Sequence, residues 1–222
     1  MPGIGYSWGG VLKINEIFYS IQGESSLMGY PTVFVRTSGC HLRCTYCDTT
    51  YAYYEGRKMD QDAILAEIQK HPTKHVCMTG GEPLLQPEVG AFMTRLCDLG
   101  YTVSLETSGD ISCHGLDPRI RKIIDIKTPD SGEFGKFSEE NLHLSDKNIE
   151  FKFVICSEKD FVWAELFTKE KRLFENFNVL YSPSFNQIEP KWLAEKILSG
   201  KSQARLQLQL HKYIWSEHQR GV

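Results

Sequence analysis

Three cysteines stand close together in one predicted loop, with the spacing C-x3-C-x2-C: Cys40, Cys44 and Cys47. A structural zinc site closes its coordination shell with four protein ligands, and an ordinary cubane iron–sulfur cluster takes four thiolates, one for each iron. Three thiolates would leave one iron without a protein ligand and free to bind a small molecule. In radical chemistry that molecule is usually S-adenosylmethionine (SAM). The spacing therefore predicts a 4Fe–4S cluster that binds SAM.

A zinc site completed by His41 is the alternative interpretation of this loop. His41 is adjacent to Cys40, so both side chains would have to turn inward at consecutive positions. His41 and Arg43 are instead expected to be solvated or to donate hydrogen bonds near the cluster. The other four cysteines lie far apart and are expected to be small buried residues or bystanders: Cys77, Cys97, Cys113 and Cys156.

Length and composition favour a single-domain enzyme. A chain of 222 residues with 41% hydrophobic residues can bury a full core, and one domain over residues 1–222 is expected. The net charge of -3 argues against nucleic acid as a partner. Residues 1–10 lack the features of a signal peptide, and no apolar run approaches the roughly 18 residues needed to span a bilayer. A cytoplasmic protein without a membrane partner is therefore predicted.

Strand and helix patterns alternate along the chain. Strands are predicted over residues 11–20, 32–37, 74–79, 101–106, 121–127, 150–156, 178–182 and 205–210. Helices are predicted from an N-cap at Asp60 to before Pro72, over 87–100, from a cap at Asp160 to about 172, and over 190–198. The alternation predicts an α/β fold, an incomplete TIM-like barrel of about six parallel strands.

Several polar or glycine residues fall at the predicted carboxyl ends of these strands, where α/β folds build their sites. Arg36 precedes the cysteine loop and could hold a carboxylate through two hydrogen bonds, or could form a surface salt bridge. Gly80 and Gly81 would let the main chain approach a ligand closely. Glu106 could bind ribose hydroxyls or pair with a lysine. In the last predicted strand, leucines alternate with Gln207, Gln209 and His211, so the polar face is expected to point toward a cavity or solvent.

The motifs together resemble a known family, the 7-carboxy-7-deazaguanine synthases of the radical SAM superfamily, which act in queuosine biosynthesis. The resemblance spans nearly the whole chain and rests on residues 16–24 (EIFYSIQGE), 34–36 (FVR), 47–49 (CDT), 79–83 (TGGEP), 106–109 (ETSG) and 209–213 (QLHKY). It implies a lyase that converts 6-carboxy-5,6,7,8-tetrahydropterin to 7-carboxy-7-deazaguanine with loss of ammonia, and that regenerates SAM.

The resemblance also implies roles for individual residues. Cys40, Cys44 and Cys47 would hold the 4Fe–4S cluster, and Thr49 would donate its hydroxyl group to a Mg²⁺ ion. The residues expected at SAM are Gly81, Glu106, Asp125, Ile126 and Lys127. Those expected at the pterin are Ile21, Gln22, Gly23, Arg36 and Thr79, with Gln209 and His211 as further candidates. Family members are homodimers, and an electron donor such as flavodoxin or ferredoxin is expected as a partner.

Two features depart from the family pattern. Many members carry Ser-Pro-Lys where this chain has Asp125-Ile126-Lys127, and residues 214–222 continue past the last matching motif. Two other functions remain open from the residues alone. One is a radical SAM activase that makes a glycyl radical on a protein partner. The other is a zinc or electron-transfer module without enzymatic activity.

Overall fold

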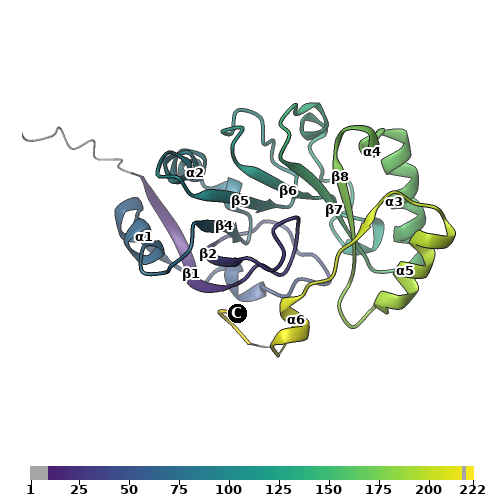
Figure 1. Ribbon diagram of the computed structural model, residues 1–222, viewed down its shortest axis with the longest axis horizontal. Coiled ribbons are helices and arrows are strands. Elements are labelled where there is room, and N and C mark those ends of the chain that lie inside the picture. Colours follow the sequence, from purple (N-terminus) through teal and green to yellow (C-terminus); the bar gives the residue numbers. More distant parts are fainter. Residues whose placement is uncertain (1–9, 217–218) are drawn as a thin grey trace, which may run out of the picture.

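The computed structural model describes residues 10–216 and 219–222, and nine strands within them form one sheet in the order β3-β1-β2-β4-β5-β6-β7-β8-β9 (Figure 1). Their bounds are β1 Val11–Ile21, β2 Pro31–Thr37, β3 Arg57–Asp60, β4 His75–Gly80, β5 Thr102–Thr107, β6 Arg121–Asp125, β7 Ile149–Ile155, β8 Asn178–Pro183 and β9 Arg205–Leu206. Strands β2 and β4 to β9 run parallel, whereas β1 is antiparallel to both neighbours. The two edge strands do not pair, so the predicted incomplete barrel is confirmed.

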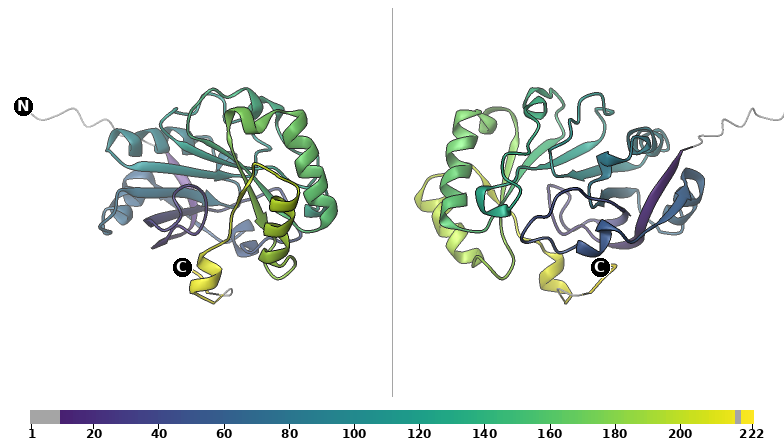
Figure 2. Two further views of the ribbon diagram at one scale, coloured as in Figure 1. Left: turned by 45° about the vertical axis from the view of Figure 1, so that its right-hand side comes forward. Right: turned by 180° about the vertical axis from the view of Figure 1, so that it is seen from behind.

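Helices cover the outside of this curved sheet, while the last helix and the chain end lie across its open side (Figures 1 and 2). The helices are α1 Gln61–Ile68, α2 Glu88–Asp98, α3 Glu158–Glu170, α4 Leu173–Asn176, α5 Pro190–Ser199 and α6 His211–Ile214. Short 3₁₀ turns cover Thr50–Tyr53, Pro83–Leu85, Pro129–Ser131 and Glu139–His143. Among the described residues, no helix is both long and apolar enough to cross a membrane.

The hydrophobic pattern explains these elements. The apolar stripe of α2, Val89, Phe92, Met93 and Leu96, is fully buried against the sheet. Asp60 caps α1 as predicted, since its carboxylate accepts a hydrogen bond from the backbone N–H of Ala63.

The predicted cap of α3 is wrong by three residues. Ser157 is the N-cap, and its hydroxyl group accepts a hydrogen bond from the Asp160 N–H. Asp160 is fully buried one turn later, where it accepts bonds from the Thr128 hydroxyl group and from the backbone of Asp130 and Cys156. Its carboxylate therefore joins α3 to the loop after β6.

The last predicted strand is much shorter than expected. Only Arg205 and Leu206 pair with β8, and Leu206 is 39% exposed whereas Gln207 is 2% exposed. The leucine face of this segment thus does not join the core, which corrects the sequence interpretation. Gln209 and His211 nevertheless face a cavity, as the alternation predicted.

Candidate active site

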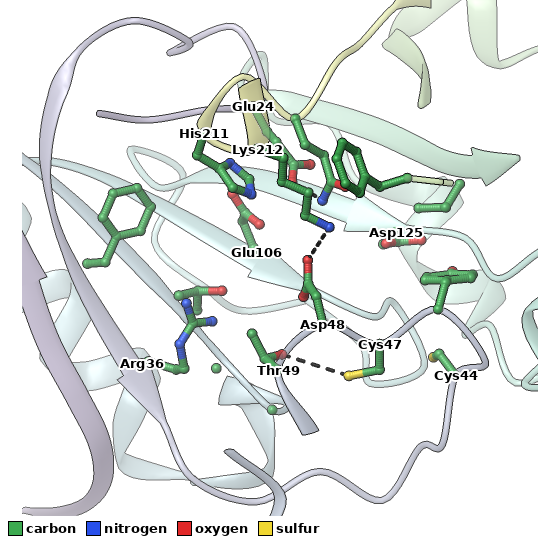
Figure 3. A pocket seen from close by; sticks show the side chains of 18 of the residues that line it. Glu24, Arg36, Cys44, Cys47, Asp48, Thr49, Glu106, Asp125, His211 and Lys212 are labelled. Carbon is green, nitrogen blue, oxygen red and sulfur yellow. Dashed lines mark hydrogen bonds and ion pairs between the residues drawn. The ribbon is translucent and has the colours of Figure 1, made fainter. Parts of the chain in front are cut away.

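A cavity of about 660 Å³ opens at the carboxyl ends of the parallel strands (Figure 3). It brings together most of the residues that the sequence singled out: Ile21, Gln22, Arg36, Cys40, Cys44, Cys47, Thr49, Thr79, Gly81, Glu106, Asp125, Lys127, Gln209 and His211. A volume of this size is typical of sites for small molecules and cofactors.

Two predicted residues do not line the cavity with their side chains. Ile126 is 1% exposed and packs in the core, and its backbone N–H donates to the Lys152 carbonyl group at 2.8 Å. Gly23 lies beneath His211, where an added Cβ would stand 2.2 Å from the His211 Nδ1 atom. Because the Ile126 side chain is in the core, this residue could contact a ligand only through its main chain. Gly23 provides the space that the His211 imidazole ring occupies.

The cysteine loop is held by hydrogen bonds from outside the cavity. Arg43 donates to the Cys40 carbonyl oxygen at 2.8 Å and to the Tyr54 hydroxyl group, and its guanidinium group lies 4.2 Å from the centre of the Tyr53 ring. His41 pairs with Asp110 instead of turning toward the cysteines. Both residues thus support the loop from its outer side.

The three thiols suit a multinuclear cluster better than one zinc ion. Within the described part of the chain, no three His, Cys, Asp or Glu side chains converge closely enough to hold a single metal ion. The three cysteines nevertheless line one cavity, which fits a cluster that takes one thiolate per iron. Burial raises the pKa of Cys44 to about 11, so metal binding must drive its deprotonation. The zinc alternative with His41 is therefore not supported by the geometry.

The paired glycines allow two loops to approach each other. A Cβ at Gly81 would lie 2.1 Å from the carbonyl oxygen of Gly39, and one at Gly80 would lie 2.3 Å from the Thr37 hydroxyl oxygen. Gly80 also has a φ of +154°, which side chains disfavour. The two glycines thus allow the end of β4 to lie against Thr37 and Gly39, and the approach of this main chain to a ligand stays a prediction.

Glu82, which follows the glycines, is a structural anchor that the sequence interpretation missed. It is fully buried, and its carboxylate accepts hydrogen bonds from the Thr107 hydroxyl group at 2.8 Å and from the N–H and hydroxyl groups of Ser108. The ends of β4 and β5 are therefore joined at the cavity edge.

A chain of charges crosses the cavity floor. Lys152 on β7 binds Glu24 at 2.8 Å and lies 3.7 Å from Asp125, which also pairs with Lys127 at 3.2 Å. Gln209 donates to the other Glu24 oxygen at 2.9 Å. Burial alone would raise the pKa of Glu24, but the Lys152 ammonium group, with smaller contributions from His211 and Gln209, outweighs burial and lowers the pKa to about 2.

Lys152 and Glu24 were not among the predicted site residues. The signal for Lys152 was a lysine between two phenylalanines in a mostly apolar strand, since such a charge is rarely buried without a partner. The signal for Glu24 was its place in the Gln-Gly-Glu turn. Lys212 was missed as well; its ammonium group binds Asp48 at 2.6 Å and so connects α6 to the cysteine loop (Figure 3).

Glu106 differs from Glu24 in that the nearby Lys152 and Arg36 charges do not offset its burial. Within the described residues it forms no ion pair, and its only hydrogen-bonding neighbour is the Cys77 thiol at 3.9 Å. Burial, reinforced by the nearby Glu24 charge, raises the pKa of Glu106 to about 7. The alternative of a pair with a neighbouring lysine is therefore wrong, and the carboxyl group can hold a proton near neutral pH.

Four buried polar atoms of cavity-lining residues have no hydrogen-bond partner among the described residues: Gln22 Nε2, Tyr46 Oη, Asp125 Oδ1 and Ser184 Oγ. Buried polar groups are rarely left unpaired, because desolvation costs about 1 to 3 kcal/mol each. The set contains donors and acceptors, so it suits a polar ligand.

The end of the chain contributes one wall. Gln219, Arg220, Gly221 and Val222 line the cavity, and the Arg220 guanidinium group lies 3.8 Å from the Tyr51 ring centre. Residues 219–222, which lie past the last family motif, are therefore at the site.

Comparisons with known proteins agree with this geometry. Residues 34–130 match the model of the Radical SAM superfamily. The chain is 44% identical to the 7-carboxy-7-deazaguanine synthase of Chlorobaculum tepidum, over 95% of this chain and 97% of the relative. It is 42% identical to that of Koribacter versatilis, over 95% and 100%. The crystal structure of QueE from Escherichia coli shares the fold with a TM-score of 0.75 at 21% identity, over 90% of this chain and 95% of that one.

The superfamily match implies a 4Fe–4S cluster and SAM as cofactors, and three thiolates facing one cavity fit that requirement. The relatives cover the chain almost from end to end, so the match is not limited to the cysteine motif. The chain therefore belongs to the 7-carboxy-7-deazaguanine synthases, a family of lyases within the Radical SAM superfamily.

Proposed function

We propose that the chain converts 6-carboxy-5,6,7,8-tetrahydropterin to 7-carboxy-7-deazaguanine with release of ammonia, in the pathway to the queuosine modification of tRNA. The observation that supports this most directly is that the three cysteines and Arg36 face one cavity of about 660 Å³. A carboxylated substrate held by Arg36 would then lie beside the cluster. No feature of the described residues favours a glycyl-radical activase.

The cofactors would bind at the strand ends. Cys40, Cys44 and Cys47 would hold the cluster, which together with SAM would supply the radical chemistry that removes hydrogen from the substrate. The residues proposed to contact SAM are Gly81, Glu106, Asp125, the main chain of Ile126, and Lys127. The unpaired Asp125 Oδ1 atom is an acceptor for an amino or hydroxyl group, and a protonated Glu106 could donate to a ligand oxygen.

The pterin would lie between β1, β2 and α6. Arg36 would bind its carboxylate, and the unpaired Gln22 Nε2 group would donate to a ring acceptor. Burial lowers the pKa of His211, so its imidazole is neutral at pH 7 and can accept or donate one hydrogen bond. Ile21, Gly23, Thr79 and Gln209 complete the proposed set.

A Mg²⁺ ion is proposed at Thr49, which lines the cavity together with Asp48. Hydroxyl and carboxylate oxygens suit this ion, which commonly keeps several waters and substrate oxygens as ligands. The ion would orient the substrate carboxylate and stabilise negative charge.

Further parts of the proposal concern the whole protein. We infer one domain over residues 1–222, a homodimer, and an electron donor such as flavodoxin or ferredoxin. All seven cysteines are unpaired, which supports a reducing compartment such as the cytoplasm.

The first test is an anaerobic assay of the reconstituted protein with SAM, reductant, Mg²⁺ and the carboxylated pterin. Formation of 7-carboxy-7-deazaguanine, followed by mass spectrometry, would support the proposal. Cleavage of SAM to 5′-deoxyadenosine without this product would contradict the proposed substrate but would still support radical SAM chemistry.

Arg36 can be tested in the same assay. Loss of a charge-assisted hydrogen bond costs about 1.5 to 3 kcal/mol, so Arg36→Ala should raise KM by about 10-fold to 100-fold while SAM affinity stays within about 2-fold. Arg119→Ala is the control, since Arg119 pairs with Asp98 and Asp117 outside the cavity. Unchanged pterin kinetics in the Arg36 variant would show that its assigned role is wrong.

A further inference from the structure

Arg36 is held on one side by a residue that the proposed function does not use. Its Nε atom lies 2.7 Å from Glu16 Oε1, and both side chains are mostly buried, at 14% and 19% exposure. Glu16 stands directly opposite Arg36 in the antiparallel β1–β2 pair, because a register shift between Ile14 and Glu16 adds Asn15 as an extra residue. Such a bulge changes which residues of the two strands meet.

Tyr51 binds the same carboxylate oxygen of Glu16. Its hydroxyl group donates to Glu16 Oε1 at 2.8 Å, and its ring centre lies 5.9 Å from the Arg36 guanidinium carbon. Arg220 packs on the Tyr51 ring at 3.8 Å and pairs with Glu55 at 3.1 Å. Tyr51 is therefore fixed at its hydroxyl group and over its ring.

One edge of the guanidinium group is thus engaged and the other is available. Within residues 10–216 and 219–222 the two Nη groups of Arg36 make no hydrogen bond to the protein, and the side chain is directed into the pocket (Figure 3). A planar guanidinium group binds a carboxylate best when two parallel N–H groups meet both oxygens. Orientation therefore matters for this residue as much as charge does.

We propose that Glu16 and Tyr51 are positioning residues that orient Arg36 so that its Nη groups face the carboxylate of the substrate. This inference rests on the proposed function, because it takes the carboxylated pterin as the ligand of Arg36. Glu16 accepts from the Nε edge, and Tyr51 keeps the Glu16 carboxylate from rotating away. Without Glu16 and Tyr51, the Arg36 side chain would rotate freely in the unbound protein. Binding the substrate would then have to order it, and this entropy cost would weaken the affinity.

A purely electrostatic role of Glu16 predicts the opposite result. Glu16 is an anion beside Arg36, so its removal would strengthen the attraction of Arg36 for a carboxylate. Glu16→Gln keeps an acceptor oxygen and removes the charge, whereas Glu16→Ala removes both. The two variants therefore separate orientation from charge.

The experiment measures the dissociation constants of two ligands for anaerobic, cluster-loaded protein with SAM. The ligands are 6-carboxytetrahydropterin and tetrahydropterin without the carboxylate. For the carboxylated ligand we expect Glu16→Ala to weaken binding at least about 10-fold, Tyr51→Phe about 3-fold to 10-fold, and Glu16→Gln less than about 3-fold. Affinity for the other pterin should change by less than about 2-fold in every variant.

The control is Glu175→Gln, which breaks an arginine Nε–glutamate pair of similar length, Arg172–Glu175 at 2.8 Å, outside the cavity, and should leave both constants within about 2-fold. If Glu16→Ala fails to fold or to take up iron, Tyr51→Phe still decides the question, since it removes one hydroxyl group and keeps the ring.

The possible failures are distinguishable. Unmodified protein that binds both pterins equally would contradict the role of Arg36 in the proposed function, and this inference with it. Unmodified protein that prefers the carboxylated pterin, with variants that retain this preference or tighten it, would overturn the positioning role alone.

Discussion

Replacing Lys152 by methionine should destabilise the protein far more than a typical substitution, which costs about 1 kcal/mol. Lys152 lies on β7, an interior strand of the sheet, where its ammonium group binds Glu24 at 2.8 Å and lies 3.7 Å from Asp125. The two side chains of the Lys152–Glu24 pair are only 9% and 8% exposed. Methionine preserves the length and apolar stem of the side chain and removes the charge, leaving two carboxylates without their shared cation.

The size of the effect follows from the pKa of Glu24. The folded protein lowers it from 4.5 to about 2, and each pKa unit is worth about 1.4 kcal/mol, so the interactions of the Glu24 carboxylate contribute about 3 kcal/mol at neutral pH. Removing one partner of a buried pair typically costs about 3 to 5 kcal/mol, because the other charge stays buried. The two routes agree on about 3 kcal/mol.

Urea unfolding of the metal-free protein at pH 7 measures this loss. Lys70→Met is the matched control: Lys70 binds Glu67 at 2.7 Å, but the pair is 61% and 38% exposed, so about 0.5 kcal/mol or less is expected. The double variant Lys152→Met/Glu24→Gln should recover part of the loss, since it removes the uncompensated carboxylate. A loss for Lys152→Met within about 1 kcal/mol of the control would refute the reasoning.

The pH dependence gives an independent check. A carboxyl group with a lowered pKa contributes stability that is fully present above its unfolded value and is lost as the pH falls. For Glu24 the loss should occur between pH 4.5 and about 2 in the unmodified protein. In Lys152→Met this part of the acid dependence should be reduced, because the cation that lowers the pKa is gone.

Three further outcomes are expected. The pKa of Glu106 is raised to about 7, so the free energy of unfolding should fall by up to about 3 kcal/mol as the pH rises from 4.5 to about 7. Glu106→Gln should abolish this pH dependence in urea unfolding, and an unchanged dependence would contradict the assignment. Cys44→Ala should prevent cluster assembly, measured by iron content and visible absorbance, whereas Cys97→Ala outside the cavity should not; normal iron in the first variant would disprove its role as a ligand. Gly81→Ala would place a methyl group 2.1 Å from the Gly39 oxygen, so we expect about 2 kcal/mol or more of destabilisation by urea unfolding, and a loss under about 0.5 kcal/mol would show that the loops can separate.

Local sequence patterns were sufficient for the elements whose signals are local. The cap at Asp60 and the apolar stripe of α2 depend on neighbouring residues, and both were predicted correctly. The strand after residue 204 was predicted too long, because alternation of leucine and glutamine cannot show whether a partner strand is present. Asp160 was mistaken for a cap because its partners, Thr128 and Asp130, are 30 or more residues distant.

The candidate site divides in the same way. The C-x3-C-x2-C spacing and the order of the surrounding motifs identified the chemistry, since a cluster with an open iron requires that ligand set within one short loop. The same motifs named most of the residues that line the cavity.

Pairing across the cavity was decided only by the tertiary structure. Glu24 meets Lys152, Glu16 meets Arg36 and Tyr51, and Lys212 meets Asp48, each across a gap in sequence that no local pattern encodes. The sheet decides which strand ends meet, and therefore which carboxyl groups form ion pairs. Glu24 forms an ion pair and stays ionised, whereas burial of Glu106 lets it hold a proton up to about pH 7. The chain thus specifies its cofactor chemistry in a single loop, while the protonation and orientation of the groups around it exist only once the sheet has formed.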